Sequence, residues 1–251
     1  MRGHLVLADI SGYTQFLNES ELEHANGIIG ELLNSIIEAI DAPLEVSRIE
    51  GDAVFMYGVV PEGMNGLTVL ETVEQTYVSF RGALETMVLN TTCQCNACVN
   101  IKALGLKIVM HCGEFVVTPV GMMKTLSGSD VITAHRLLKN TVIETTGIAD
   151  YLLVTQTCVD DLGLERLAAR WVPHTESYDD VGEVPGYVAS LVESWEAMRK
   201  RKTVKVGEED AWQSWRIETT APPAIVWDHL TDPPKRTQWL SANSNEVVDD
   251  D

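Results

Sequence analysis

Two aspartates in this sequence follow or interrupt apolar runs at the point where a turn begins. Asp9 comes directly after the run 5–8, and Asp52 lies between the runs 44–49 and 53–57. An aspartate taken singly is most often an ordinary turn residue. If the first strand lies beside the hairpin, however, both carboxylates meet at one sheet edge and suit Mg²⁺ or Mn²⁺, which carry substrate phosphates. The pair therefore predicts a divalent-metal site for a phosphate-bearing ligand.

The segment after Asp9 has the residues to receive such a ligand. Gly12 lets the backbone approach a phosphate closely, and free N–H groups of the turn at Tyr13 and Thr14 can donate to its oxygens. Because Asp and Gly crowd ordinary turns, this prediction depends on both aspartate segments occurring together.

Three cysteines, Cys93, Cys95 and Cys98, fall within one short loop before an apparent strand. Thiolates at this spacing suit a structural zinc ion, which needs a fourth ligand. The candidates for that ligand are Cys112, His111 and Cys158. The alternative is a loop of reduced thiols without metal, since a cytosolic chain of this size does not need disulfide bonds.

The spacing of apolar residues predicts alternating strands and helices. The predicted elements are a strand at 5–8, a helix at 22–40, a hairpin at 44–57, a helix at 66–89, strands at 104–112 and 114–120, a helix at 131–139 and a strand at 151–155. Ser20 and Glu23 have the spacing of a capping box for the helix at 22–40. The β, α, β, β, α, β order predicts an α/β (α+β) fold with a ferredoxin-like sheet and added strands and helices.

A change in composition near residue 196 divides the chain. We expect a domain over 1–195, a charged linker over 196–210 and a further segment over 211–251. In the last segment a strand at 212–220 and a helix at 224–230 are predicted. Its tryptophans, either anchors of a hydrophobic pocket or core residues, are Trp212, Trp215, Trp227 and Trp239.

The chain is acidic, with 18 Lys and Arg against 37 Asp and Glu and a formal charge of −19. Such a surface repels nucleic acids and anionic lipid, so a phosphate-rich ligand has to be received locally, through metal. No apolar run reaches the roughly 18 residues of a membrane span, and the first run is too short for a secretory signal. We therefore expect a cytoplasmic protein without nucleic-acid or membrane partners.

Three segments together resemble the motifs of the class III adenylyl and guanylyl cyclases. They are 5–14 (LVLADISGYT), similar to the first metal motif, 48–54 (RIEGDAV), similar to the second, and 128–137 (GSDVITAHRL), similar to the late Asn–Arg helix. The resemblance covers about residues 4–190 and implies the fold of a class III nucleotidyl cyclase. The cysteine loop, with 106–113 and 130–140, resembles more narrowly an uncharacterised bacterial branch of cyclase relatives.

The resemblance implies a role for each matching residue. Asp9 and Asp52 would bind two metals with help from the Ile10 carbonyl, and Arg136 would steady the α-phosphate as the ribose 3′-hydroxyl attacks it. The residues of the phosphate-binding turn would be Ser11, Gly12, Tyr13 and Thr14, and those near the base Arg48 and Thr125. The resemblance further implies a head-to-tail homodimer, in which the aspartates of one subunit face Arg136 of the other.

Four positions depart from the cyclase pattern. Arg48 stands where adenylyl cyclases usually have Lys, and Thr125 where an Asp often reads adenine. Ile132 replaces the Asn before the arginine, and Val181 replaces a phosphate-binding Lys. Because loss of one such donor costs about 10²–10³ in rate, inefficient cyclisation is expected.

We therefore predict a signalling or regulatory domain that binds a nucleoside triphosphate, ATP in preference to GTP, with weak or no turnover. The alternatives are an active adenylyl cyclase that converts ATP to cAMP and pyrophosphate, and a dimerisation module without nucleotide binding. Each alternative keeps the same fold.

The segment 211–251 resembles the opening strand and helix of START-like helix-grip domains of the polyketide cyclase (SRPBCC) type. The resemblance rests on 220–227 (TAPPAIVW) and 230–233 (LTDP). Because a closed domain of this type needs several more strands, we expect an incomplete piece without a working pocket.

Overall fold

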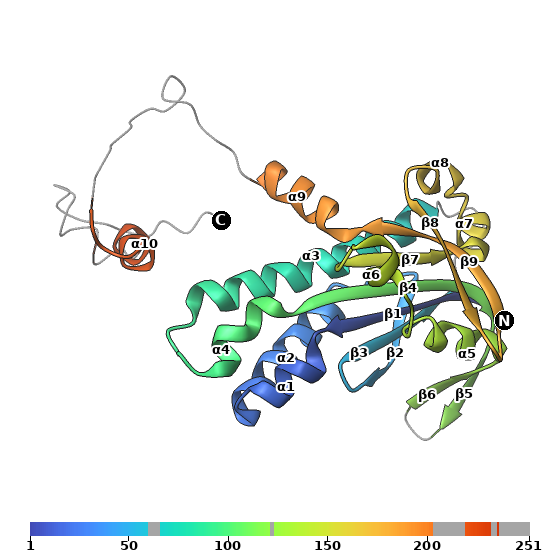
Figure 1. The fold of residues 1–251 in the computed structure, drawn as a ribbon, viewed down its shortest axis with the longest axis horizontal. Coiled ribbons are helices and arrows are strands. Elements are labelled where there is room, and N and C mark those ends of the chain that lie inside the picture. Colours follow the sequence, from blue (N-terminus) through green and yellow to red (C-terminus); the bar gives the residue numbers. More distant parts are fainter. Residues whose placement is uncertain (60–65, 121–122, 203–218, 232–234, 236–251) are drawn as a thin grey trace, which may run out of the picture. The chain divides into compact units, whose positions relative to one another are not determined.

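The computed structural model describes residues 1–59, 66–120, 123–202, 219–231 and 235 (Figure 1). The chain divides into two compact units, 1–203 and 204–251. The first unit contains a mixed sheet covered by helices. Within the described residues, no helix has the length and apolar character needed to cross a bilayer.

Seven strands form the main sheet of the first unit, in the order β2-β3-β1-β4-β7-β9-β8 (Figure 1). Described pairs are antiparallel except the parallel pair of β4 and β7. The strands are β1 (Arg2–Ser11), β2 (Leu44–Glu50), β3 (Ala53–Gly58), β4 (Gly105–Glu114), β7 (Tyr151–Thr155), β8 (Val172–Tyr178) and β9 (Gly182–Ser190). A separate hairpin pairs β5 (Val116–Val120) with β6 (Met123–Ser127). The predicted fold class, an α/β (α+β) fold whose sheet carries added strands and helices, is confirmed.

Side chains of β1 alternate between two cores, as the period of a strand requires. Val6, Ala8 and Ile10 enter the larger core, whereas Leu5 and Leu7 pack with the other face. The larger core is built with α1 (Tyr13–Glu19), α2 (Leu22–Glu38), α3 (Gly66–Asn90), α4 (Asn96–Asn100), the 3₁₀ turn η1 (Ile101–Ala103), α7 (Gln156–Leu162), α8 (Glu165–Ala168) and α9 (Leu191–Lys202). The other face is covered by α5 (Ser129–Arg136) and α6 (Val142–Thr146). Asp9 follows the parity of Leu5 and Leu7, so it belongs to the face that α5 covers.

The helix predicted at 22–40 is present as α2, but its predicted capping box is wrong. Glu21 is the N-cap residue, and no side chain caps this helix. The Ser20 hydroxyl is buried without a hydrogen-bond partner among the described residues. The Glu21 carboxylate instead accepts the N–H groups of Asn96 and Ala97, so it caps α4. Tertiary packing of the cysteine segment therefore overrides the local capping signal.

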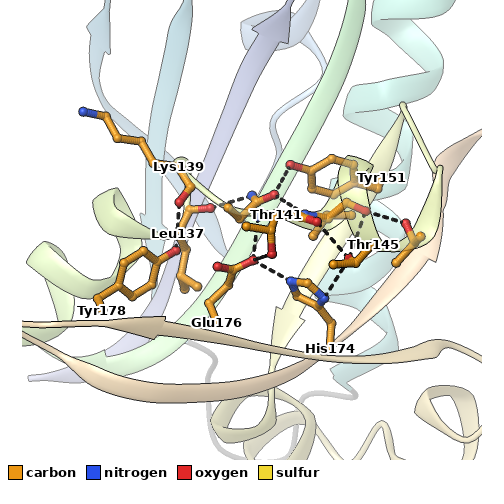
Figure 2. Close-up of polar contacts among 11 residues, drawn as sticks. Leu137, Lys139, Thr141, Thr145, Tyr151, His174, Glu176 and Tyr178 are labelled. Atoms are coloured by element: carbon orange, nitrogen blue, oxygen red, sulfur yellow. Dashed lines mark hydrogen bonds and ion pairs between the residues drawn. The ribbon is translucent and has the colours of Figure 1, made fainter.

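The helix predicted at 131–139 is shorter at its end, because α5 stops at Arg136. A polar network fixes the chain that follows (Figure 2). Asn140 donates to the Leu137 carbonyl at 2.7 Å, and Tyr178 donates to the Lys139 carbonyl at 3.2 Å. Buried Glu176, 5% exposed, accepts the Thr141 N–H at 2.7 Å and lies 2.6 Å from His174 Nε2. The network holds the segment directly after Arg136 in place.

Sequence periodicity missed several short elements. The segment 13–19 is helical, and residues 172–178 and 182–190 form an antiparallel pair at the sheet edge. Part of the predicted linker, 196–202, belongs to α9, whose Trp195 is buried in the larger core.

The second unit is described only in part. It contains α10 (Pro223–Thr231), in agreement with the predicted helix, and Trp227 on it is 68% exposed. The predicted strand at 212–220 lies almost wholly outside the described residues, as do Trp212, Trp215 and Trp239.

Candidate metal and nucleotide site

The two predicted metal ligands lie at the same end of neighbouring strands. Asp9 pairs in register with Ala53, the residue after Asp52, and the Ile10 N–H donates to the Asp52 carbonyl at 3.1 Å. Burial and then the negative charge of Asp9 raise the pKa of Asp52 above its usual range. Two carboxylates that repel each other in a half-buried place favour a cation that neutralises both.

Sequence reasoning did not single out Lys107 as a member of this site. Its ammonium lies 2.9 Å from the Asp9 carboxylate and also donates to the Leu138 carbonyl at 3.1 Å. Both side chains of the ion pair are largely buried, at 16% exposure for Asp9 and 22% for Lys107. We call Asp9, Asp52 and Lys107 the carboxylate edge; one positive charge leaves it with a net negative charge.

The turn after β1 is shaped by Gly12, which adopts the left-handed conformation with φ of 84°. The Tyr13 and Thr14 N–H groups precede the first bond of α1, donated by Phe16 N–H to the Gly12 carbonyl at 2.9 Å. Gly12 and Thr14 are exposed, so a ligand can reach this backbone. The Ser11 hydroxyl is buried, which leaves its backbone as the part that can serve a ligand.

Arg48 and Arg136, predicted for the base and the α-phosphate, line one pocket of about 770 Å³. We call it the basic pocket, since its lining includes Arg48, His135, Arg136 and Lys139. Arg48 forms an ion pair with Glu50 and lies 5.2 Å from the centre of the Phe55 ring. Each arginine of the pocket is thus paired with a carboxylate, Arg48 with Glu50 and Arg136 with Asp180.

Of the other predicted positions, Ile132 also lines the basic pocket, whereas Thr125 and Val181 do not. Thr125 sits on β6, half-buried and paired in register with Thr118, and does not line the basic pocket. Ile132 and Val181, the two substituted donors, line a second pocket of about 530 Å³. Arg136 forms an ion pair with Asp180, next to Val181, at 2.8 Å. The structure therefore brings together the two positions predicted to lack a donor, next to the arginine.

The cysteine loop gathers its three thiols, but the expected fourth ligand is wrong. His24, on the first turn of α2, joins Cys93, Cys95 and Cys98. Cys112 lies on β4 in another cluster with His4 and Asp161. His111 instead contacts Thr155 and Asp130, and Cys158 is fully buried in α7. A single histidine on an amphipathic helix carries no sequence signal for a metal ligand, so His24 was missed.

The cluster of His4, Cys112 and Asp161 was also not foreseen. His4 Nε2 lies 3.1 Å from the Asp161 carboxylate, and the Arg2 guanidinium lies 3.3 Å from the same side chain. Burial raises the pKa of the Cys112 thiol to about 12, and Asp161 adds to the effect. A neutral thiol beside an arginine is a poor cation ligand.

Comparison with known proteins gives a family and a fold. The family model "Protein of unknown function (DUF2652)" matches residues 29–146. The chain is 30% identical over 169 residues to "Uncharacterized protein Rv2561/Rv2562" of Mycobacterium tuberculosis, with 66% of this chain and 74% of that protein covered.

Solved structures of cyclases share the architecture. The guanylyl cyclase Cya2 has a TM-score of 0.58 at 14% identity, covering 76% of this chain and 92% of its own. The adenylyl cyclase CyaB from P. aeruginosa has 0.52 at 15%, covering 76% and 96%. A bacterial light-regulated adenylyl cyclase has 0.51 at 14%, covering 79% and 97%. At these identities the similarity shows the fold.

Proposed function

This chain belongs to the same family as the mycobacterial protein Rv2561/Rv2562, and we propose that it is a regulatory domain that binds a nucleoside triphosphate with divalent metal. In this proposal Asp9 and Asp52 hold Mg²⁺ or Mn²⁺, and turnover is weak or absent. ATP is the favoured nucleotide.

The observation that carries the proposal is the proximity of two carboxylates, Asp9 near the end of β1 and Asp52 in the turn before β3, where burial and then the charge of Asp9 raise the pKa of Asp52. Their oxygens match the ligand preference of Mg²⁺ and Mn²⁺, and the neighbouring Ile10 carbonyl is a further oxygen of the same kind. Bound metal would neutralise phosphate charge and hold the triphosphate in place. Lys107 keeps the Asp9 carboxylate oriented by its ion pair at 2.9 Å.

The phosphates have a second partner in the turn after β1. The Tyr13 and Thr14 N–H groups are free of helical bonds, and the backbone is exposed at Gly12. These donors lie only a few residues from Asp9, so metal and backbone can hold the same triphosphate. The anionic ligand is received locally despite the acidic surface, because the basic pocket supplies Arg48 and Arg136.

Weak turnover is favoured by the second pocket. Ile132 and Val181 line it together, and neither can donate a hydrogen bond or oppose phosphate charge. Arg136, which would have to steady the α-phosphate, is engaged with Asp180 at 2.8 Å. Each missing donor costs about 10²–10³ in rate, so a site that retains binding is expected to cyclise slowly.

A head-to-tail homodimer completes this proposal, with the carboxylate edge of one subunit facing the basic pocket of the other. Exposed apolar side chains on α5 and on the β5–β6 hairpin support an interface there. They are Val116 at 60%, Val120 at 54% and Ile132 at 55% exposure.

Two further parts of the proposal concern the cysteines. A structural zinc ion at the cysteine loop is retained, with a ligand set different from the predicted one. A cytoplasmic location is supported by all five cysteines being free thiols.

Calorimetry with a non-hydrolysable ATP analogue and Mn²⁺ tests the binding. Loss of a residue that only hydrogen-bonds to a metal ligand already lowers metal affinity about 10–100-fold. Because Asp9 would be a ligand itself, Asp9→Ala is expected to weaken binding by at least about 100-fold. Asp41→Ala, which removes an exposed carboxylate before β2, is the control and should bind like the wild type. Equal affinity in wild type and Asp9→Ala would show that Asp9 does not hold the metal, and no binding at all would leave only a dimerisation module.

An assay for cyclic product with ATP, GTP and Mn²⁺ separates binding from catalysis. We expect little or no product from either nucleotide. Rapid cAMP formation that Asp9→Ala abolishes would establish the active adenylyl cyclase instead.

A further inference from the structure

Four side chains with soft ligand atoms meet at the start of α2 and of α4. His24 Nδ1 lies 3.1 Å from the Cys95 sulfur, 3.9 Å from the Cys93 sulfur and 4.0 Å from the Cys98 sulfur. All four ligand atoms lie within 4.8 Å of one another. They come from two segments about 70 positions apart in the chain.

These separations match a tetrahedral zinc site. With Zn–S of about 2.3 Å and Zn–N of about 2.0–2.1 Å, ligand atoms at tetrahedral angles are roughly 3.5–3.8 Å apart. The measured His24 distances of 3.1, 3.9 and 4.0 Å bracket that range. Thiolate and imidazole are the ligands that zinc prefers, whereas Mg²⁺ and Ca²⁺ prefer oxygen.

Contacts that involve no metal already hold the ligands in position. The Glu21 carboxylate accepts the N–H groups of Asn96 and Ala97 at 3.3 and 3.1 Å, which ties the start of α2 to the start of α4. Ala97 is fully buried in the larger core. The backbone N–H of Cys95 donates to the Cys93 sulfur, and that of Cys98 donates to the Cys95 sulfur. A cluster so fixed loses little conformational entropy on binding an ion.

We propose that His24, Cys93, Cys95 and Cys98 form a structural zinc site that fastens the segment 91–104 to the N-terminal turn of α2. The four protein ligands close the tetrahedron and leave no open position, which distinguishes a structural site from a catalytic one. We call these four residues the cysteine–histidine cluster.

The fastened segment continues into the carboxylate edge. After α4 the chain forms η1, and a Cβ added at Gly12 would lie 3.3 Å from the Ala103 carbonyl and 3.9 Å from Leu104. Residues 103–104 therefore lie directly against the turn that follows Asp9. If the proposed function holds, zinc also steadies the phosphate-binding turn, although the zinc site itself does not depend on that function.

The second cluster of the chain offers a discriminating control. His4, Cys112 and Asp161 also lie within 4.8 Å of one another. Arg2 lies 3.3 Å from Asp161, and a fixed positive charge there opposes a second cation. Cys112→Ala therefore should not change zinc content.

The test measures zinc in the full-length protein, purified under reducing conditions with zinc supplied, by elemental analysis. We expect about one zinc per chain, and at least about a 100-fold loss of zinc affinity in His24→Ala and in Cys93→Ser. His24→Cys keeps four soft ligands and should retain the metal. With Co²⁺ in place of zinc, this variant should show stronger thiolate-to-cobalt absorption than the wild type, a change that loss of folding would not produce.

Three outcomes would overturn the proposal. They are zinc well below one per chain with all thiols reduced, unchanged zinc in His24→Ala, and loss of zinc in Cys112→Ala but not in Cys93→Ser. Failure of nucleotide binding would leave the zinc result untouched, so the two proposals can be judged separately.

Discussion

The carboxylate edge and the cysteine–histidine cluster differ in their candidate ligand atoms and in the structural elements that bring those atoms together. The first has oxygen ligands on neighbouring strands, in a register that the hairpin and β1 impose. The second has sulfur and nitrogen ligands from a loop and a distant helix, joined by Glu21 and by packing of Ala97. The chemistry of the proposed ligands therefore favours different metals at the two places, and only the carboxylate edge was predicted from the order of strands along the chain.

The largest expected effect is independence of the two metal sites. In Asp52→Ala, Mn²⁺-dependent nucleotide affinity should fall at least about 100-fold while zinc content stays at the wild-type value. In Cys98→Ser, zinc should be lost while nucleotide affinity falls by less than about tenfold, because Ala103 and Leu104 support the Gly12 turn without contacting ligand. Calorimetry and elemental analysis of each variant measure both quantities. Loss of both metals in both variants would show a single coupled site and break the comparison.

The second prediction concerns pH. Burial and the charge of Asp9 raise the pKa of Asp52, so this carboxyl stays protonated up to a higher pH than an ordinary aspartate. Mn²⁺ has to displace that proton in order to bind. Mn²⁺ affinity should therefore fall by up to about tenfold per pH unit below the raised pKa and level off above it. Titrations of Mn²⁺ from pH 4 to 8 by calorimetry measure this profile. An affinity independent of pH throughout that range would mean that Asp52 is not a ligand.

The third prediction concerns Gly12, which follows Asp9 and lies against Ala103 in the segment that continues from the cysteine–histidine cluster. Gly12→Ala should lower stability by about 1–2 kcal/mol because its φ of 84° is left-handed, and should weaken nucleotide binding because the new methyl presses on the Ala103 carbonyl. Gly163→Ala is the matched control, with φ of 64° and no neighbour within 4 Å of the new methyl. Denaturant unfolding and calorimetry should show similar destabilisation in both variants and weaker nucleotide binding in Gly12→Ala alone. Weakened binding in both would point to a general loss of order.

The smallest effect is a gain in stability. A raised pKa means that folded Asp52 binds its proton more tightly than unfolded Asp52, so its contribution to stability is present at acid pH and is lost as the pH rises through the raised value. Asp52→Asn should therefore stabilise the metal-free protein at pH 7 by up to about 1 kcal/mol, or about 2–4 °C in Tm. Thermal unfolding at pH 7 and at pH 4 measures this difference, which should shrink at pH 4. Destabilisation at pH 7 would indicate that Asp52 serves the fold instead of a cation.

Local patterns located the regular elements that carry strong periodicity. The helices at 22–38 and 66–90 and the hairpin around Asp52 agree with their predicted positions. The edge strand β8 and its neighbour β9 were missed, because their pattern of half-buried residues has no clear alternation. The capping box of Ser20 and Glu23 failed because Glu21, whose carboxylate accepts N–H groups of α4, is the N-cap residue of α2.

The sequence by itself predicted binding roles for the two aspartates, the turn at Gly12 and the three cysteines, because each of these signals depends on neighbours within a few residues. It also predicted the fold class, since the succession of strands and helices along the chain follows from the order of apolar runs. Only the tertiary structure decided that Lys107 neutralises Asp9, that Ile132 and Val181 share a pocket, and that His24 joins the cysteines. The physical reason is that a charge pair or a ligand set depends on distances of a few ångströms between side chains far apart in the chain. Such distances are set by packing of the whole core, and no local periodicity records them.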